Sequence, residues 1–384
     1  MATSQKSSSR IRLKELTIEN FKAIDHITLK FDPPRMRADP DIYVMGSRNG
    51  IGKTSILESC ALIFLAAYSG EEKFNIGKIP ELSVNLSELF VRSGAEKSNL
   101  IGVFSSGAIN LTIHVQLSKK GVLSVTGDRE RIKKIFESAG NRPAEDLTER
   151  FFMLLAGFNM EPVTMPPCLY FHSYRKVQEG NPELGMMVES EMMMHRRMVR
   201  TSYGRMRISP GDNVFVSTFK LHILRAMMGR ANLFEKLDSK NADETFEKLN
   251  GLILRYAGGT IEKLRPSLDN TVDFRITPKN GGDSFAFDGL SSGQKEIIST
   301  LFLVWHYTRN QPCIVLIDEP ELHLNAEWHR DFVQQIFKLA PENQYIFATH
   351  SEDIFKSVND DRRLFLGMEE TSSQSVHQNG EDRP

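Results

Sequence analysis

Alternating apolar and polar positions at the start of the chain predict an antiparallel β layer. Residues 11–18 have the alternation of a half-buried strand, an Asn-Phe-Lys turn follows, and a second strand is expected at residues 27–31. The pattern returns at residues 109–117 and 122–125, which are separated by a Lys-Lys-Gly turn and predict a hairpin. Residues 71–107 show no pattern that assigns them to helices or strands.

Short runs of continuous apolar residues predict strands that are buried on both faces, as in a parallel sheet. The clearest run covers residues 314–317, and further short strands are expected at residues 42–45, 169–171 and 345–348. Helical patterns alternate with these runs, so the predicted fold class is α/β. Helices are expected at residues 56–68, 129–137, 144–155, 242–256, 297–307 and 326–339, and further strands at residues 271–276, 284–287 and 363–366.

The segment 186–236 has a composition of its own. Nine of the sixteen methionines fall between Met186 and Met228, and the segment carries nine Arg or Lys residues against four acids. Flexible thioethers and arginines suit an adaptable surface for an acidic or phosphate-bearing partner, including nucleic acid. The alternative is a helical subdomain with core methionines and solvated arginines. The polar tail at residues 369–384 is expected to be disordered.

The whole-chain composition points to a soluble protein. The 48 basic and 49 acidic residues nearly cancel, so any basic surface must be local. Three separated cysteines, Cys60, Cys168 and Cys313, lie in apolar surroundings and are expected to be buried thiols in a reducing compartment. Neither a signal peptide nor an apolar run of about 18 residues occurs, so we expect a cytoplasmic protein without a membrane partner.

A glycine-rich turn at residues 46–55 stands between a predicted strand and a predicted helix. Consecutive backbone N–H groups in such a turn can wrap a phosphate, and the helix N-terminus adds positive potential. In this pattern Lys53 reaches the β- and γ-phosphates of a nucleotide and Thr54 ligates Mg²⁺. The alternative is a plain glycine-rich turn. The candidate nucleotide-binding residues are Asn49, Gly50, Gly52, Lys53, Thr54 and Ser55.

Polar residues follow two of the predicted buried strands. Asp318 and Glu319 end the strand at residues 314–317, where open α/β sheets place ligand chemistry. One acid at such a strand tip can hold Mg²⁺, and its neighbour can polarise an attacking water. His350 ends the strand at residues 345–348 and can contact a γ-phosphate or order that water. The alternatives are polar turn residues or helix caps and a structural histidine.

Two further polar features have less specific explanations. Ser291, Gly293 and Gln294 open the helix predicted at residues 297–307 and form a second candidate anion site, although a helix cap is the commoner use of such residues. Arg175 follows the strand at residues 169–171 and could face a phosphate. A surface ion pair is the default expectation for it.

Four segments resemble, in chain order, the Walker A, signature, Walker B and switch-histidine motifs of ABC-class ATPases. They are residues 49–54, 290–294, 314–319 and His350. Residues 16–22 resemble the first strand of the branch that includes the SMC, Rad50 and RecF proteins. The sequences Asp-Glu-Pro-Glu-Leu-His-Leu and Thr-His-Ser are similar to those of OLD-type and related AAA-family ATPases of bacterial antiphage systems, such as the Septu, Gabija, PARIS and retron-associated ATPases.

This resemblance implies an ABC-type ATPase head with a mixed central sheet, an antiparallel N-terminal β layer and a helical insertion. The implied division is an N-terminal lobe at residues 1–180, an insertion at residues 181–265 and a C-terminal lobe at residues 266–368. It also implies a head-to-tail homodimer, or a higher oligomer, that encloses ATP and Mg²⁺ between subunits.

The resemblance implies a role for each residue of this sequence that matches a motif of the family. Lys53 and the backbone at Gly50 and Gly52 would hold phosphates, and Thr54 and Asp318 would hold Mg²⁺. Glu319 would activate water, His350 would sense the γ-phosphate, and Ser291 with Gly293 would complete the partner's site. Ser47 and Ser292 stand where glycine is usual, and Gln178 is the candidate for the family's glutamine loop.

Two functions follow from the resemblance. The first is an ATPase sensor or scaffold that controls a separately encoded effector, such as a nuclease, in antiphage defence. We expect the effector in trans because 34 residues after His350 are too few for the fused Toprim nuclease of OLD-type proteins. The alternative is a RecF-like DNA-repair ATPase that clamps DNA. A transporter subunit fits poorly because the Asn-Phe-Lys opening belongs to the other branch.

Overall fold

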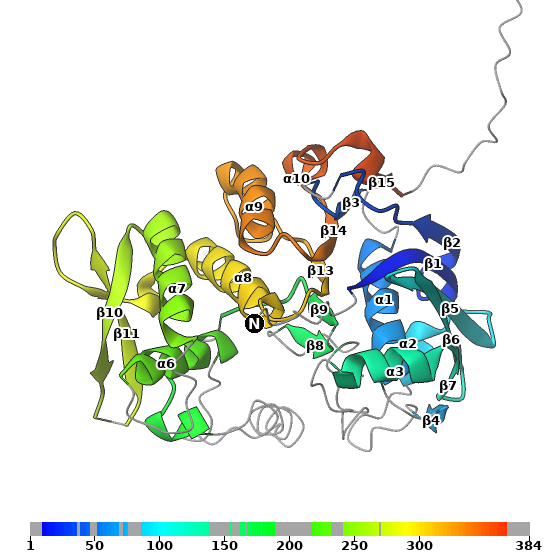
Figure 1. Cartoon of the computed structure of the whole chain (residues 1–384), viewed down its shortest axis with the longest axis horizontal. Coiled ribbons are helices and arrows are strands. Elements are labelled where there is room, and N and C mark those ends of the chain that lie inside the picture. The colour runs from blue at the N-terminus through cyan, green and yellow to red at the C-terminus, as the bar shows by residue number, and fades with distance from the viewer. Residues whose placement is uncertain are drawn as a thin grey trace, which may run out of the picture.

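Two large sheets with helices between and beside them form the protein (Figure 1). The computed structural model describes residues 10–36, 39–46, 52–68, 72–75, 86–138, 154, 162–165, 167–177, 179–188, 217–231, 241–268 and 270–366. The helix expected at residues 144–155 lies almost wholly outside these residues, as do the tail, Gln178 and the central part of the Met/Arg-rich segment.

The first sheet is the predicted antiparallel layer, with strand order β2-β1-β5-β6-β7-β4. Leu16 and Ile18 alternate inward along β1, and a register shift between Leu13 and Glu15 brings Leu13 inward as well, so all three are fully buried. The predicted antiparallel pairing of β1 with β2 and the predicted hairpin of β6 and β7 are both present. The unassigned region contributes β5 at the centre of the sheet. The strands are β1 (Ile11–Phe21), β2 (Ile24–Lys30), β4 (Lys73–Asn75), β5 (Lys97–Ser106), β6 (Ile109–Ser118) and β7 (Val122–Gly127), with helices α2 (Leu86–Phe90) and α3 (Arg129–Ser138).

The second sheet contains the predicted buried strands in the order β15-β3-β14-β13-β9-β8. The first five run parallel, and β8 is antiparallel to β9, so the sheet is mixed as expected. Because parallel strands share a carboxyl edge, the residues that follow β3, β13 and β14 meet there. The strands are β3 (Ile42–Gly46), β8 (Val163–Met165), β9 (Cys168–Phe171), β13 (Ile314–Asp318), β14 (Gln344–Thr349) and β15 (Arg363–Phe365).

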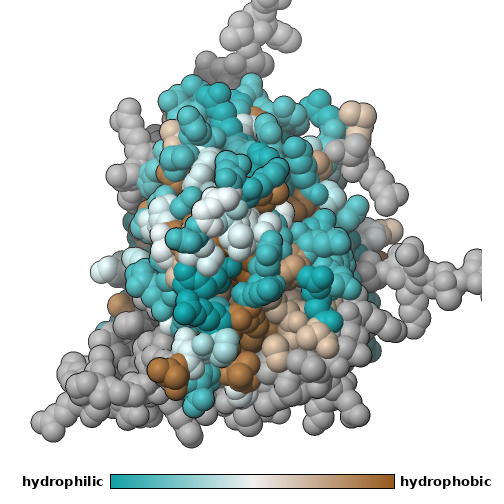
Figure 2. All heavy atoms as spheres, turned by 90° about the vertical axis from the view of Figure 1, so that its left-hand side faces the viewer, coloured by the Kyte–Doolittle hydropathy of each residue, from teal (hydrophilic) through white to brown (hydrophobic). Residues whose placement is uncertain are grey.

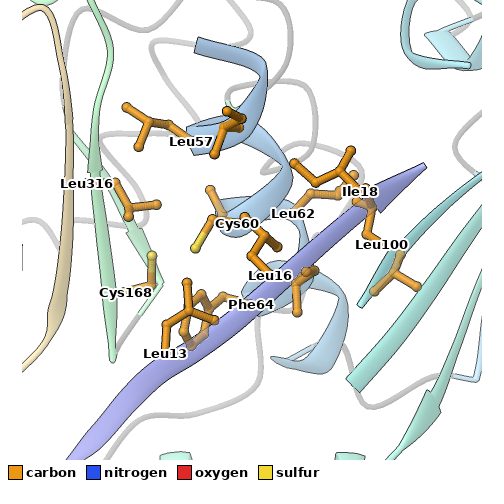
Figure 3. Close-up of a cluster of buried hydrophobic side chains, with 14 of the residues drawn as sticks. Leu13, Leu16, Ile18, Leu57, Cys60, Leu62, Phe64, Leu100, Cys168 and Leu316 are labelled. Carbon is orange, nitrogen blue, oxygen red and sulfur yellow. The ribbon is translucent and has the colours of Figure 1, made fainter. Parts of the chain in front are cut away.

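Helix α1 (Lys53–Tyr68) lies between the two sheets and is buried on every side. Figure 3 shows its side chains packed against β1 and β5 on one flank and against Leu316 and Cys168 on the other. Burying one Leu in such a core stabilises the fold by about 1.5–3 kcal/mol. This packing fixes the first turn of α1 at the carboxyl edge of the parallel sheet.

The three cysteine thiols are buried and free, as predicted. Burial raises the pKa of each, that of Cys313 to about 12. Thiols with such raised pKa values are unreactive and serve as small apolar core groups.

A second core covers the opposite face of the parallel sheet. It is built by helices α6 (Thr218–Arg230), α7 (Ala242–Ala257), α8 (Ser292–Thr308), α9 (Ala326–Leu339) and α10 (Glu352–Lys356). A small antiparallel sheet completes this lobe with β10 (Gly259–Pro266), β11 (Val272–Pro278) and β12 (Phe285–Ala286), and three 3₁₀ turns lie at Leu184–Val188, Phe287–Gly289 and Asp360–Arg362. Figure 2 shows that the outer face over β10, β11 and α7 is largely hydrophilic, with apolar residues gathered low on it.

The described end of the Met/Arg-rich segment belongs to the core. Phe219 and Ile223 of α6 are fully buried, and Met227 and Met228 pack against the same cluster. For these residues the core explanation of the methionines holds. The proposed domain boundaries stay predictions, and that at residue 265 falls inside β10. Among the described residues, no helix is both long and apolar enough to cross a membrane.

Candidate nucleotide-binding site

Residues far apart in the sequence meet at the carboxyl edge of the parallel sheet. The hydroxyl of Thr54, in the first turn of α1, donates to Asp318 Oδ2 over 2.9 Å. Lys53 Nζ lies 3.4 Å from His350 Nδ1, and His350 Nε2 lies 3.7 Å from Glu319 Oε1. The structure therefore brings together the residues that the sequence assigned to Mg²⁺, water and the γ-phosphate.

Gly52, the described end of the glycine-rich turn, has a backbone conformation that favours glycine. Gly52 has φ +90°, and a Cβ placed there would lie 3.1 Å from the Ile24 side chain. Its carbonyl accepts from Ile56 N over 3.0 Å as α1 begins. Ser55 is buried beside it, whereas Ser47, Asn49 and Gly50 lie outside the described residues. Glycine is suited to Gly52 because L side chains rarely adopt a positive φ.

Asp318 is 1% exposed, and its Oδ1 has no hydrogen-bond partner among the residues that the structure describes. Burial raises the pKa of this carboxyl group to about 6, although the Thr54 hydrogen bond opposes the shift. An unpartnered buried carboxylate oxygen is costly and is the hard ligand that Mg²⁺ prefers. Thr54 and Asp318 therefore fit a Mg²⁺ ion. Substrate phosphate oxygens and water, which Mg²⁺ commonly retains, would complete its coordination.

Lys53 and Glu319 differ in their environments. Lys53 is 6% exposed, and burial lowers the pKa of its ammonium group against the opposing charges of Glu319, Asp318 and Glu321. Glu319 has φ +46°, and its backbone N–H donates to the Ala348 carbonyl over 2.8 Å. Its side chain keeps 32% exposure, so water can reach the carboxylate. A left-handed backbone at a non-glycine residue is a strained feature typical of functional sites.

Glu321 organises the loop that carries His350, a role that the sequence analysis missed. Its carboxylate accepts the Thr349 hydroxyl at 2.7 Å and the N–H groups of His350 and Ser351 at 2.5 and 3.1 Å. The Ser351 hydroxyl in turn caps α10 by accepting from Ile354 N. The only sequence signal for this role is the acid two residues beyond Glu319.

Arg175 corrects an expectation, because it is not a surface residue. It is 4% exposed and donates to the carbonyl oxygens of Asp318 at 2.6 Å and Glu319 at 2.8 Å. Its Nε pairs with Glu296 in helix α8, a residue that the sequence analysis did not single out. The reason is strand order: β9 lies beside β13, so the loop after β9 faces the end of β13.

Ser291 and Gln294 form a capping box at the start of α8, which confirms the helix-cap interpretation. The Gln294 side chain also donates to the Tyr256 carbonyl over 2.9 Å. Gly293 is required sterically, because a Cβ there would lie 2.4 Å from the His323 carbonyl oxygen. These residues form a separate group on the α7 side, and their role toward a nucleotide stays a prediction.

Parts of the chain are similar to known proteins. Residues 185–355 match the family model described as "AAA domain, putative AbiEii toxin, Type IV TA system". The chain is 32% identical over 107 residues to the Retron Vc95 probable ATPase of Vibrio cholerae serotype O1 biovar El Tor, across 25% of this chain and 20% of that protein. It is 29% identical over 121 residues to the Septu protein PtuA of Bacillus thuringiensis, across 28% of this chain and 30% of that protein.

A solved structure shows the same fold over nearly the whole chain. The SMC head bound to the C-winged helix domain of ScpA superimposes with a TM-score of 0.51 at 14% identity, covering 90% of this chain and 92% of that one. This likeness concerns the fold alone. The chain thus has the fold of an SMC head, and residues 185–355 match an AAA-domain model. It covers less than a third of the length of the two relatives, which are named from a retron and a Septu system.

Proposed function

We propose that the protein binds and hydrolyses ATP at the carboxyl edge of its parallel sheet. The observation that carries the proposal is the Thr54 hydroxyl 2.9 Å from Asp318, whose second carboxylate oxygen is buried without a partner among the described residues. Lys53, Glu319 and His350 surround this pair. Lys53 provides a cation that can bind phosphate, Glu319 provides a carboxylate that can activate water, and Thr54 and Asp318 provide two oxygen ligands for a metal ion.

Each residue has a distinct part in the proposed reaction. Lys53 and the backbone at the start of α1 hold the β- and γ-phosphates, and Thr54 with Asp318 would hold Mg²⁺. A bound Mg²⁺ supplies positive charge to the phosphate oxygens. The carboxylate of Glu319 accepts a hydrogen bond from the attacking water, and His350 contacts the γ-phosphate. Because Lys53 and Asp318 are buried, their charges act with little solvent screening.

We further propose that two copies enclose the nucleotide. One helix N-terminus leaves part of a γ-phosphate open to water, whereas the exposed first turn of α8 from a second copy can cover it. Ser291, Gly293 and Gln294 would then complete the partner's site. Ser291 is available for this role because it is exposed at the start of α8, whereas Gln294 is half-buried and supports Ser291 through the capping box.

In the cell, we propose that this ATPase is a cytoplasmic sensor or scaffold in antiphage defence that controls a separately encoded effector, such as a nuclease. The similarity to proteins named from a retron and a Septu system supports this proposal. Those matches span 20% and 30% of the two relatives' lengths, so their partners enter only as a proposal. A RecF-like DNA clamp instead predicts ATP-dependent duplex binding that falls steeply with salt.

The experiment that tests this function is phosphate release from ATP with Mg²⁺, measured beside equilibrium ATP binding. We expect wild-type protein to bind and hydrolyse ATP and Lys53→Ala to lose both activities. Lys338→Ala, which removes an exposed lysine from α9, is the matched control and should behave as wild type. Equal ATP affinity for wild type and Lys53→Ala would contradict the assignment.

A further inference from the structure

Arg175 joins two parts of the molecule that the proposed reaction uses separately. Its Nη1 and Nη2 donate to the carbonyl oxygens of Asp318 at 2.6 Å and Glu319 at 2.8 Å. Its Nε pairs with Glu296, which lies five residues beyond Ser291 on the buried side of α8. One guanidinium group thus connects the turn that carries both site carboxylates with the helix whose first turn would cover a second nucleotide.

The turn that Arg175 holds needs support. Glu319 adopts φ +46°, a conformation that persists only where the surrounding structure fixes it. The Glu319 N–H is bound by the Ala348 carbonyl over 2.8 Å, and its own carbonyl is bound by Arg175. The planar guanidinium suits this task because it presents several donors in a fixed fork, which a lysine ammonium cannot reproduce.

Glu296 in turn fixes Arg175. It is 5% exposed, and its Oε1 also accepts the Thr300 hydroxyl over 3.2 Å within α8. A buried charge keeps its position when a partner and hydrogen bonds satisfy it. Arg175 has both, since its Nη1 also donates to the His172 carbonyl over 3.0 Å.

We propose that Arg175 is a positioning residue for ATP hydrolysis: it holds the Asp318–Glu319 turn in its left-handed conformation, and Glu296 makes this hold depend on the position of α8. Neither residue touches the nucleotide in this account. Movement of α8 on docking a second copy would be transmitted to Glu319 through the ion pair. The inference rests on the proposed ATPase function and adds a route by which the site senses its partner.

The chain offers a closely matched control. Arg12 is 7% exposed, pairs with the buried Asp41 at 2.6 Å and donates to the carbonyl oxygens of Phe31 and Asp32 at 2.6 and 2.5 Å. Its chemistry therefore resembles that of Arg175, since each guanidinium group pairs with one buried carboxylate and donates to backbone carbonyls. Asp41, however, precedes β3 at the opposite edge of the sheet. Loss of either ion pair should destabilise the fold, but only loss of the Arg175–Glu296 pair should lower the rate of ATP hydrolysis.

The experiment compares Arg175→Lys and Glu296→Gln with Arg12→Lys and Asp41→Asn in the full chain. For each variant, ATP affinity, kcat and the melting temperature are measured. We expect kcat to fall about tenfold or more in the Arg175 and Glu296 variants while ATP affinity stays within about twofold. The Arg12 and Asp41 variants should lose similar thermal stability and keep kcat within about twofold.

The possible outcomes distinguish failure of the positioning role from failure of the proposed ATPase function. If all four variants lose kcat in proportion to their loss of stability, or if both site variants hydrolyse ATP at the wild-type rate, the positioning role is wrong and the ATPase function stands. If wild-type protein neither binds nor hydrolyses ATP, both proposals are wrong. Glu296→Gln keeps the side-chain volume, so it decides the matter where Arg175→Lys does not fold.

Discussion

The carboxylate of Glu321 accepts the backbone N–H of His350 over 2.5 Å and thereby ties the end of β14 to the loop that follows β13. Thr349 and Ser351 donate to the same carboxylate. A carboxylate can satisfy three donors at once because each oxygen has two acceptor positions. The position of His350 beside Lys53 therefore depends on Glu321.

We predict that Glu321→Gln lowers kcat by about tenfold and reduces the free energy of unfolding by about 1–3 kcal/mol. The amide keeps one acceptor oxygen and places an N–H₂ group against donors. Steady-state ATP hydrolysis and denaturant unfolding would measure the two effects. Glu327→Gln, at an exposed position in the first turn of α9, should change neither. Unchanged kcat in Glu321→Gln would show that the His350 loop is held by other contacts.

The raised pKa of Asp318 predicts how the free energy of unfolding changes with pH. Burial raises its pKa from 3.8 to about 6, so between these pH values the folded protein binds more protons than the unfolded chain. Its ionisation therefore lowers the free energy of unfolding as pH rises from about 4 to about 6, by up to about 3 kcal/mol. Asp318→Asn should be more stable than wild type at pH 7.5 and should lose this advantage near pH 4.

A second aspartate provides a control of opposite sign. Asp331 is partly buried, yet hydrogen bonds from Arg255 and Tyr256 outweigh desolvation and lower its pKa. Its ionised form therefore stabilises the fold above the unfolded pKa, and Asp331→Asn should reduce stability at pH 7.5. Denaturant unfolding at both pH values measures the difference. If Asp318→Asn were also less stable than wild type at pH 7.5, the unpartnered-carboxylate interpretation would fail.

Gly293 tests the close approach of α8 to the loop after β13. A Cβ at this position would meet the His323 carbonyl at 2.4 Å, so Gly293→Ala must displace backbone. We predict a loss of about 1–3 kcal/mol in the free energy of unfolding, together with weaker ATP-dependent dimerisation. Gly251→Ala is the matched control: its Cβ meets nothing within 4 Å inside α7, and it should be neutral or stabilising by up to about 1 kcal/mol. Light scattering and calorimetry distinguish the two variants.

The local pattern was sufficient to predict most strands and helices of the site. The apolar runs of β13 and β14 identify strands buried on both faces, and the carboxyl ends of parallel strands meet by geometry. The approach of Asp318 and His350 to Lys53 could therefore be expected before any contact was known. Helix α1 begins at Lys53, three residues earlier than its apolar pattern indicated.

The features that the sequence did not predict depend on contacts between distant parts of the chain. Strand β5 was missed because its outward positions include Ile101 and Val103 and its inward ones include Ser98 and Gly102, which hides the alternation. For a related reason the surface expectation for Arg175 was wrong and the role of Glu321 was missed. An Arg or a Glu has the same local signal at the surface and in a buried network, and only the order of β9, β13 and β14 in the sheet decides between them.

We propose that Glu319 activates water in a site closed by two copies of the chain. The most direct measurement is light scattering with nucleotide quantification on Glu319→Gln in ATP and Mg²⁺, beside the Glu327→Gln control. We predict that Glu319→Gln accumulates as a dimer with unhydrolysed ATP bound, whereas Glu327→Gln hydrolyses ATP as wild type does. A Glu319→Gln protein that stays monomeric and releases phosphate at the wild-type rate would contradict the account.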